Sequence, residues 1–240
     1  MRKKILVLTT ETSHHSYFVK KLSEGFEDIS VFCQNGKQHV FPYETNHSFE
    51  SSREQLELKK WFDGDKVRLD SFAKTKSFDT LNGDLAVDAL AKENADIIIV
   101  FGTGRLSKRV LDLYPGKMFN LHGGDPERYR GLDSHLWAIY HQDFAALVTT
   151  LHCLDENLDT GDIISQCEVK ITKDMPIEAL RSANTETCVA MTVALIDAIK
   201  RTGSVVFRKQ IQVGRYYSAM PSVLKEICIE KFSRFTKQLK

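Results

Sequence analysis

Three polar residues, Asn120, His122 and Asp159, form the set of side chains in this sequence that is best suited to chemistry. Asn120 and His122 are one residue apart at the end of the apolar run 118–121, just before a loop rich in Gly and Pro. Residues i and i+2 of a strand project from the same face, so both side chains can reach one reacting centre. Asp159 lies in a turn-rich stretch between two apolar runs. An amide, an imidazole and a carboxylate can together move an acyl group onto an amine.

Each of the three can take a separate part in such a transfer. Asn120 can donate an amide N–H to a developing oxyanion, a contribution typically of about 3–4 kcal/mol. His122 can accept or relay the proton of the amine, because histidine titrates near neutral pH. Asp159 can fix the orientation and tautomer of the histidine, and can accept the amine proton directly or through a water. No serine or cysteine has a nucleophile motif, so no covalent intermediate is expected.

The elements that must position these residues alternate along the chain. Short apolar runs rich in β-branched residues lie at 3–8, 29–33 and 96–101, and helical patterns precede the second and third. Continuous apolar strands that alternate with amphipathic helices predict a parallel sheet with helices on both faces. We therefore expect an α/β fold with a Rossmann-like, mostly parallel sheet.

The rest of the chain yields further elements. The helical pattern before residue 96 places Leu81, Leu85 and Leu90 on one apolar face, whereas the polar stretch 34–77 contains one helical candidate, 51–62. We expect a catalytic domain over 1–203 and a short C-terminal extension over 204–240. The remaining predicted elements are strands at 118–121, 147–153, 163–169 and 211–214, and helices at about 134–141, 176–203 and from about 221.

Composition limits the possible partners. The 240 residues contain 33 Lys and Arg against 32 Asp and Glu, a near balance that disfavours a general nucleic-acid binder. The five cysteines include no C-x-x-C pair, and the N-terminal apolar run is too short for a signal peptide. No apolar stretch is long enough to span a membrane. We expect a reduced, cytoplasmic protein with neither a nucleic-acid nor a membrane partner.

Three other features have plain structural interpretations. Gly102-Thr-Gly104 follows a strand but lacks the third glycine of a dinucleotide fingerprint, which makes an NAD site a weak interpretation. His14 and His15 are adjacent, so their side chains should point apart, and no further ligand lies at a recognisable spacing. No metal is therefore expected. His152 lies in an apolar strand and is interpreted as a structural histidine.

Residues 95–170 resemble the formyltransferases that use N10-formyltetrahydrofolate, and residues 1–33 resemble them more loosely. That family includes glycinamide ribonucleotide formyltransferase, methionyl-tRNA formyltransferase and the sugar-nucleotide N-formyltransferases. Its pattern is Asn-x-His, a loop that ends in Arg-Tyr-x-Gly, a helix, a strand and a Leu-Asp-x-Gly turn. Here the motifs read Asn120-Leu-His122, Arg128-Tyr-Arg-Gly131 and Leu158-Asp159-Thr-Gly161.

The resemblance implies N10-formyltetrahydrofolate as the cosubstrate and no metal. In the family, the turn before Asn-x-His lines the pteridine pocket, and the loop that ends in the Leu-Asp-x-Gly turn wraps it. The implied cofactor-binding residues are Gly104, Leu106, Leu154, Asp155, Asn157 and Asp159. Thr10 and His14 follow the first strand, where open sheets bind ligands, and His135 lies where related enzymes often have a second histidine. These three are candidates for acceptor binding.

The acceptor amine is inferred by elimination. Residues 204–240 are too few for a tRNA-gripping domain of roughly one hundred residues. The segment after the first strand lacks the phosphate-binding glycine loop of the glycinamide ribonucleotide enzymes. We therefore expect the acceptor to be an amino-deoxysugar linked to a nucleotide. Glycinamide ribonucleotide or another small amine is the alternative, and a non-catalytic folate- or nucleotide-binding module is the alternative of another class. The oligomeric state is open, with a homodimer as one option.

Overall fold

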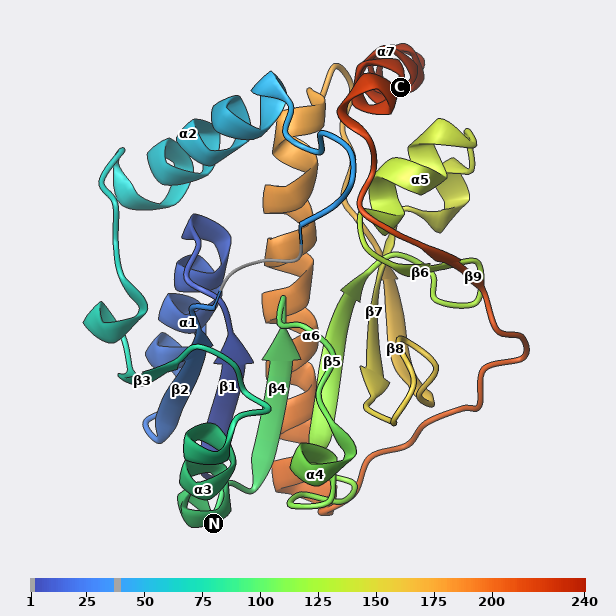
Figure 1. Cartoon of the computed structure of the whole chain (residues 1–240). Coiled ribbons are helices and arrows are strands. Elements are labelled where there is room, and N and C mark those ends of the chain that lie inside the picture. The colour runs from blue at the N-terminus through green and yellow to red at the C-terminus, as the bar shows by residue number, and fades with distance from the viewer. Residues whose placement is uncertain (1–2, 37–39) are drawn as a thin grey trace.

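A seven-stranded sheet with the strand order β3-β2-β1-β4-β5-β7-β8 forms the centre of the molecule (Figure 1). This computed structural model describes residues 3–36 and 40–240. Residues 1–2 and 37–39, which belong to the predicted domain 1–203, lie outside the described residues. The strands of the sheet are β1 (Ile5–Thr9), β2 (Ile29–Gln34), β3 (Lys74–Phe78), β4 (Ile97–Phe101), β5 (Met118–Gly123), β7 (Val148–Cys153) and β8 (Ile163–Glu168).

The sheet is mostly parallel, as predicted. Strands β3, β2, β1, β4 and β5 are parallel to their neighbours, whereas β7 is antiparallel to β5 and to β8. Every residue of β1 and β4 is buried, which is the reason that these strands read as unbroken apolar runs. The antiparallel pairing places Asn120 of β5 directly opposite His152 of β7.

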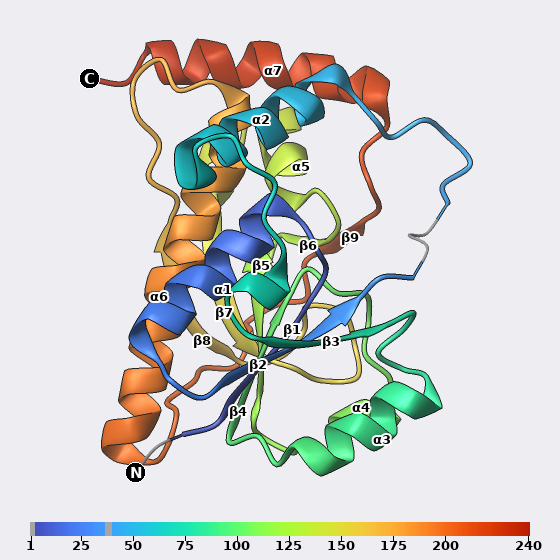
Figure 2. The same ribbon diagram turned by 90° about the vertical axis from the view of Figure 1, so that its left-hand side faces the viewer.

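Helices cover both faces of the sheet (Figures 1 and 2). On one face, α1 and α6 pack over Ile5 and Val7, and on the other, α3 and α4 pack over Leu6 and Leu8. The strand period of two thus divides β1 between two apolar cores. The helices are α1 (Ser13–Gly25), α2 (Ser48–Phe62), α3 (Asp84–Glu93), α4 (Lys108–Leu111), α5 (Ser134–Tyr140), α6 (Leu180–Thr202) and α7 (Ser222–Lys237).

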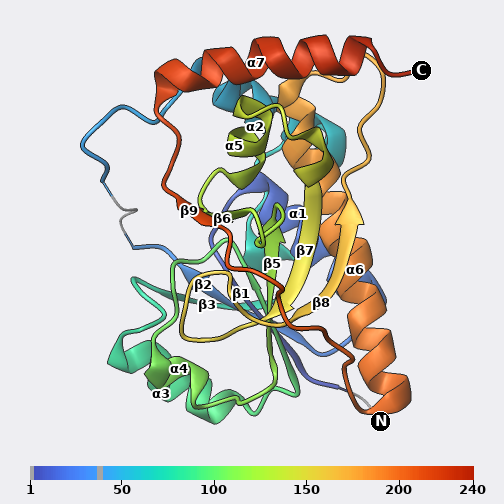
Figure 3. The same cartoon turned by 90° about the vertical axis from the view of Figure 1, so that its right-hand side faces the viewer.

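A third apolar core lies beyond the end of the sheet, where α7 runs across the molecule (Figure 3). Phe232 and Cys228 of α7 are fully buried in it, together with Leu136 of α5. Between α6 and α7 the chain forms β9 (Arg215–Tyr217), which pairs in parallel with β6 (Tyr129–Gly131). The residues predicted as a C-terminal extension therefore pack directly against the loop that follows β5.

Three sequence expectations about individual elements are wrong. Leu85, expected on the same apolar face as Leu90, is 82% exposed, whereas Val87 and Leu90 of α3 are buried against the sheet as their spacing predicted. Residues 211–214 form no strand, since their backbone binds the loop after β5, and the short strand lies at β9. Strand β3 was not expected, because its sequence KTKSF is polar and it lies at the sheet edge.

The other predicted elements are confirmed. The long helix at 176–203 is a 3₁₀ turn at Ile177–Ala179 followed by α6, which ends at Gly203 in a left-handed conformation. In the part of the chain that the structure describes, no helix is long and apolar enough to cross a membrane.

Candidate active site

Asn120, His122 and Asp159 come together at the end of β5, where all three line a cavity of about 270 Å³. Asn120 and His122 leave the same strand two residues apart, as the strand period predicted. Asp159 comes from the turn between β7 and β8, with its carboxylate 3.5 Å from His122 Nδ1 and 3.5 Å from Asn120 Nδ2. The sequence-predicted set is thus one cluster in space.

The side-chain amide of Asn120 is oriented by His152. The Nδ1–H of His152 donates to its neighbouring carbonyl, that of Cys153, at 2.8 Å. In the neutral ring Nε2 is then an acceptor, and it lies 3.1 Å from Asn120 Nδ2. The second amide hydrogen faces Asp159 across 3.5 Å, the long limit of a hydrogen bond. This hydrogen can be given to a substrate oxygen at little cost.

The imidazole of His122 is held in one tautomer by a backbone carbonyl. Its Nε2 lies 2.9 Å from the carbonyl oxygen of Tyr129, which can only accept, so Nε2 bears the hydrogen. Nδ1 is left as the atom that gains or loses a proton, and it faces the Asp159 carboxylate. Sequence reasoning assigned the choice of tautomer to Asp159, whereas the geometry gives that part to Tyr129.

Asp159 is buried but ionised. Burial alone would raise its pKa, but the charge of His122 when that ring is protonated, with the contacts of a protonated His152 and of the Gly131 N–H, outweighs burial and holds the pKa well below its usual range. The Gly131 N–H donates to the carboxylate at 2.8 Å. A carboxylate held so firmly in the charged form is a weak base. It therefore stabilises a cation beside it more readily than it takes up a proton.

The remaining walls of this cavity, which we call the slot, combine apolar side chains with polar ones. All six residues predicted to bind the cofactor line it: Gly104, Leu106, Leu154, Asp155, Asn157 and Asp159. Asp155 shapes the loop, because its carboxylate accepts the Asn157 N–H and the hydroxyl of Thr160. Arg105 closes the slot by donating to the carbonyl of Glu156 at 3.0 Å.

A second, larger cavity of about 870 Å³ adjoins the first and shares Gly102, Gly104 and Leu132 with it. Thr10 lines this larger cavity, whereas His14 lines the smaller one. The acceptor candidates are therefore divided between the two spaces.

His14 and His15 do not point apart. Their ring centroids are 3.9 Å apart, because both rings turn from the start of α1 toward Phe101 at the end of β4. Burial lowers the pKa of both, that of His15 to about 3, so both are neutral. Among residues 3–36 and 40–240, no cluster of three or more His, Cys, Asp or Glu side chains could hold a metal ion.

His135 lies behind the site and lines neither cavity. Its Nε2–H donates to the carbonyl of Val148 at 2.7 Å, and its ring packs on Gly123, the last residue of β5. Burial, with a smaller effect from His122, lowers its pKa to about 4. Its contacts support the strand that bears Asn120 and His122.

Sequence reasoning missed three residues that hold the cluster together. His152 was interpreted as structural, although a β5–β7 pairing register would have placed it opposite Asn120. Arg130 donates to the carbonyl of Leu158, and Gln210 donates to the carbonyls of Asp159 and Gly161. No sequence period relates these positions, so no local signal could have found the last two.

Comparison with known proteins identifies the family to which this fold belongs. A family model described as formyl transferase matches residues 3–196. The chain therefore belongs to the formyl transferase family. A methionyl-tRNA formyltransferase from Desulfotalea psychrophila is 31% identical over 157 residues, which cover 65% of this chain and 47% of the relative. The chain spans less than half the length of the curated relatives that it matches.

Solved structures share the fold. A candidate sugar N-formyltransferase from Mycobacterium tuberculosis has a TM-score of 0.61 at 19% identity, with 90% of this chain and 75% of that chain covered. The formyltransferase PseJ from Anoxybacillus kamchatkensis has a TM-score of 0.51 at 19% identity, with 90% and 85% covered. The latter was crystallised with a UDP-linked formamido sugar and tetrahydrofolate.

Proposed function

We propose that this protein transfers a formyl group from N10-formyltetrahydrofolate to the amine of a nucleotide-linked amino-deoxysugar. The observation that carries the proposal is the cluster of Asn120, His122 and Asp159 at the end of a slot that suits a pteridine. Family membership supports formyl transfer, and the sugar N-formyltransferases of similar fold support the acceptor class. The five cysteines are free, in keeping with a reducing, cytoplasmic setting.

The residues of the slot fit the cosubstrate. Leu106 and Leu154 would contact the ring faces, and the backbone between Gly102 and Gly104 would face its polar edge. When bound, N10-formyltetrahydrofolate supplies an electrophilic formyl carbon. Asn120, at the end of the slot, would donate its second amide hydrogen to the formyl oxygen as that oxygen gains negative charge.

Proton transfer falls to His122. Its Nδ1 would take the proton of the attacking amine, while the Tyr129 carbonyl holds Nε2. That proton would then pass to N10 as the bond between N10 and the formyl carbon breaks and tetrahydrofolate leaves. The Asp159 carboxylate, 3.5 Å from Nδ1, stabilises the imidazolium that results. Because Asp159 is already ionised, this stabilisation needs no change in its own protonation.

The larger cavity is where we propose that the acceptor binds. Hydroxyl, amide and carboxylate groups line it, including Thr10, Gln34 and Glu50, and such groups bind sugar hydroxyls. Its lysine, Lys225, is already paired with Glu50 at 2.9 Å. The sugar would therefore lie against this lining, with the phosphates of the nucleotide projecting outward.

A turnover assay with N10-formyltetrahydrofolate and separate acceptors tests the proposal. We expect formylation of a UDP- or dTDP-linked amino-deoxysugar and none in an Asn120→Ala variant. Methionyl-tRNA is the second candidate acceptor, because the sequence relatives are methionyl-tRNA formyltransferases. Turnover on methionyl-tRNA or glycinamide ribonucleotide alone would replace the sugar assignment. Binding of a folate analogue without turnover on any amine would favour a non-catalytic module.

A further inference from the structure

The segment 208–217, which we call the strap, binds both the turn of Asp159 and the loop after β5, whose Tyr129 carbonyl binds His122. It leads from α6 toward α7 along the open side of the sheet, and only β9 within it is regular structure (Figures 1 and 3). Its hydrogen-bond partners include Pro126, which accepts from the Gly214 N–H although it lies far earlier in the chain. The strap therefore brings two segments that are distant in sequence, the 159–161 turn and the loop after β5, into contact with the same stretch of chain.

Gln210 is the strap residue that binds the turn of Asp159. Its side-chain Nε2 donates to the carbonyls of Asp159 and Gly161, each at 2.9 Å. Asp159 has a left-handed backbone with φ of 54°, a conformation that costs a residue other than glycine about 1–3 kcal/mol and needs support from its surroundings. On the opposite side, Gly161 is packed so closely on Cys153 that a Cβ atom would lie 1.7 Å from the Cys153 carbonyl oxygen. The turn is thus fixed between β7 and Gln210.

The Gln210 amide acts only as a donor. Its Oε1 is buried and has no hydrogen-bond partner among the described residues. An amide turned the other way would place Oε1 against two carbonyl oxygens, which cannot donate, so the two N–H bonds to the turn fix the orientation of the side chain.

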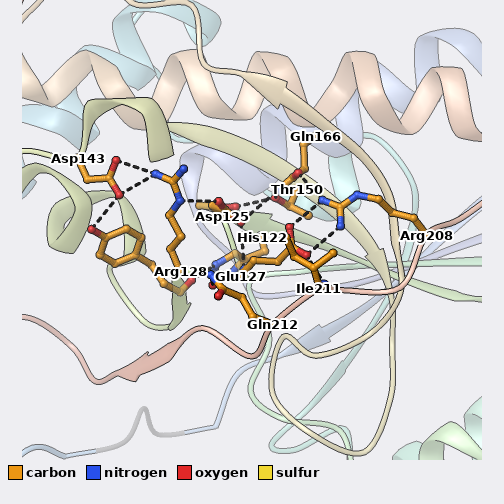
Figure 4. A network of polar contacts seen from close by, with 12 residues as sticks. His122, Asp125, Glu127, Arg128, Asp143, Thr150, Gln166, Arg208, Ile211 and Gln212 are labelled. Atoms are coloured by element: carbon orange, nitrogen blue, oxygen red, sulfur yellow. Dashed lines mark hydrogen bonds and ion pairs between the residues drawn. The ribbon is translucent and has the colours of Figure 1, made fainter.

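The strap also holds the loop after β5. The carboxylate of Glu127 accepts hydrogen bonds from both terminal nitrogens of Arg208, at 2.9 and 2.8 Å, and from the N–H of Ile211 (Figure 4). The side chain of Gln212 donates to the Glu127 carbonyl at 2.9 Å. Figure 4 shows His122 beside this network.

Arg130 joins the two attachments. Its Nε donates to the strap carbonyl of Gly214 at 2.7 Å, and a terminal nitrogen donates to Leu158 at 3.0 Å. The residues on either side of Arg130 bind the catalytic groups, because Tyr129 accepts from His122 and Gly131 donates to Asp159. A shift of the strap would therefore displace the groups that bind both His122 and Asp159.

We propose that Gln210 is a positioning residue for formyl transfer, because it holds the 159–161 turn so that the Asp159 carboxylate stays beside His122 and Asn120. The activity readout of this proposal rests on the proposed function. The placement of Gln210 rests on the contacts alone.

The first test compares Gln210→Met, which keeps the size but loses both donors, with the wild type. We expect kcat to fall about tenfold, the loss of one to two hydrogen bonds, while KM for the cosubstrate changes less than about twofold. Gln212→Met is the matched control, since it removes the same kind of bond from the same strap without touching the turn, and it should retain kcat within about threefold. Equal kcat in Gln210→Met and the wild type would overturn the proposal.

The second test needs no turnover. The groups that face the Asp159 carboxylate are His122 on β5, His152 on β7 and the Gly131 N–H, with Arg130 held at the adjacent carbonyl. A loosened turn weakens these contacts, so NMR titration of the Asp159 carboxyl should show a higher midpoint in Gln210→Met and an unchanged one in Gln212→Met. An unchanged midpoint in both overturns positioning.

Two further results are distinguishable. If the wild type formylates no amine, the proposed function fails, and the titration still decides the part of Gln210. If Gln210→Met and Gln210→Ala both fail to fold while Gln212→Met folds, Gln210 supports the fold as a whole and the positioning proposal is overturned.

Discussion

The two cavities differ in how firmly their polar groups are held. Around the smaller cavity, Asn120, His122 and Asp159 each have a protein partner that fixes the orientation of the side chain. Around the larger cavity, Glu50 and Lys225 are paired with each other, but the side-chain amides of Gln34 and Asn46 bind no other described residue. Groups that must meet one transition state gain from being preorganised. Groups that only recognise the acceptor need no fixed partner before it binds. We therefore assign the reaction to the smaller cavity and acceptor specificity to the larger one.

The largest effect should come from removing the charge of Asp159. In Asp159→Asn the side chain keeps its size but no longer stabilises the imidazolium of His122, so kcat should fall at least about a hundredfold. Steady-state kinetics on the accepted amine measure this. Asp174→Asn is the control, because Asp174 has a similar left-handed backbone, with φ of 56°, but lines neither cavity, and its kcat should stay within about threefold. Similar losses in both variants would mean that the smaller cavity is not specially organised.

The next largest effect should come from substituting Gly102, which lines both cavities. Its φ is 77°, and a Cβ atom there would lie 2.4 Å from the His15 ring. We expect Gly102→Ala to lower the free energy of unfolding by about 2–3 kcal/mol and to weaken folate-analogue binding. Gly116→Ala shares the left-handed φ, at 71°, but meets no atom within 4 Å. It should cost only about 1 kcal/mol by denaturant unfolding, and equal costs would remove the His15 contact as the cause.

The buried histidines should make the protein less stable in mild acid. The pKa of His135 is lowered from 6.5 to about 4, so below pH 6.5 the unfolded chain binds a proton that the folded protein refuses. His135 therefore favours the folded state fully above that range, and this contribution is lost as the pH falls from 6.5 toward 4. His135→Gln keeps an N–H donor for Val148 but cannot titrate. Its free energy of unfolding should fall less steeply in that window, by up to about 1.4 kcal/mol per pH unit. Parallel curves for both proteins would contradict this.

The smallest effect is expected in the larger cavity. Gln34→Ala removes one uncommitted amide, so KM for the acceptor should rise about fivefold with kcat and KM for the cosubstrate nearly unchanged. Initial rates at varied acceptor concentration test this, with Gln238→Ala at the end of α7 as the control. A fall in kcat without a change in KM would show that Gln34 contributes to the reaction step. It would contradict the assignment of the larger cavity to acceptor binding.

Features that depend on local periodicity could be predicted from the sequence, whereas features that depend on contacts between distant segments could not. The strands, most helices and the shared face of Asn120 and His122 follow from local periodicity, which the sequence records directly. The partner of Asn120 does not, because His152 faces it only through the antiparallel register of β5 and β7. The contacts of Gln210 depend on a segment without periodic structure, and Leu85 was misplaced because α3 is short and half exposed.

The strap also sets the order in which the protein can become active during its synthesis. A ribosome makes the chain from residue 1 onward, and β1 to α6 can begin to pack before the strap has left the exit tunnel. The turn of Asp159 and the loop of Glu127 gain their partners Gln210 and Arg208 only afterwards. A chain interrupted between Gly203 and Arg208 would therefore contain Asn120, His122 and Asp159 but would lack the strap side chains that hold the turn of Asp159 and the loop of Glu127.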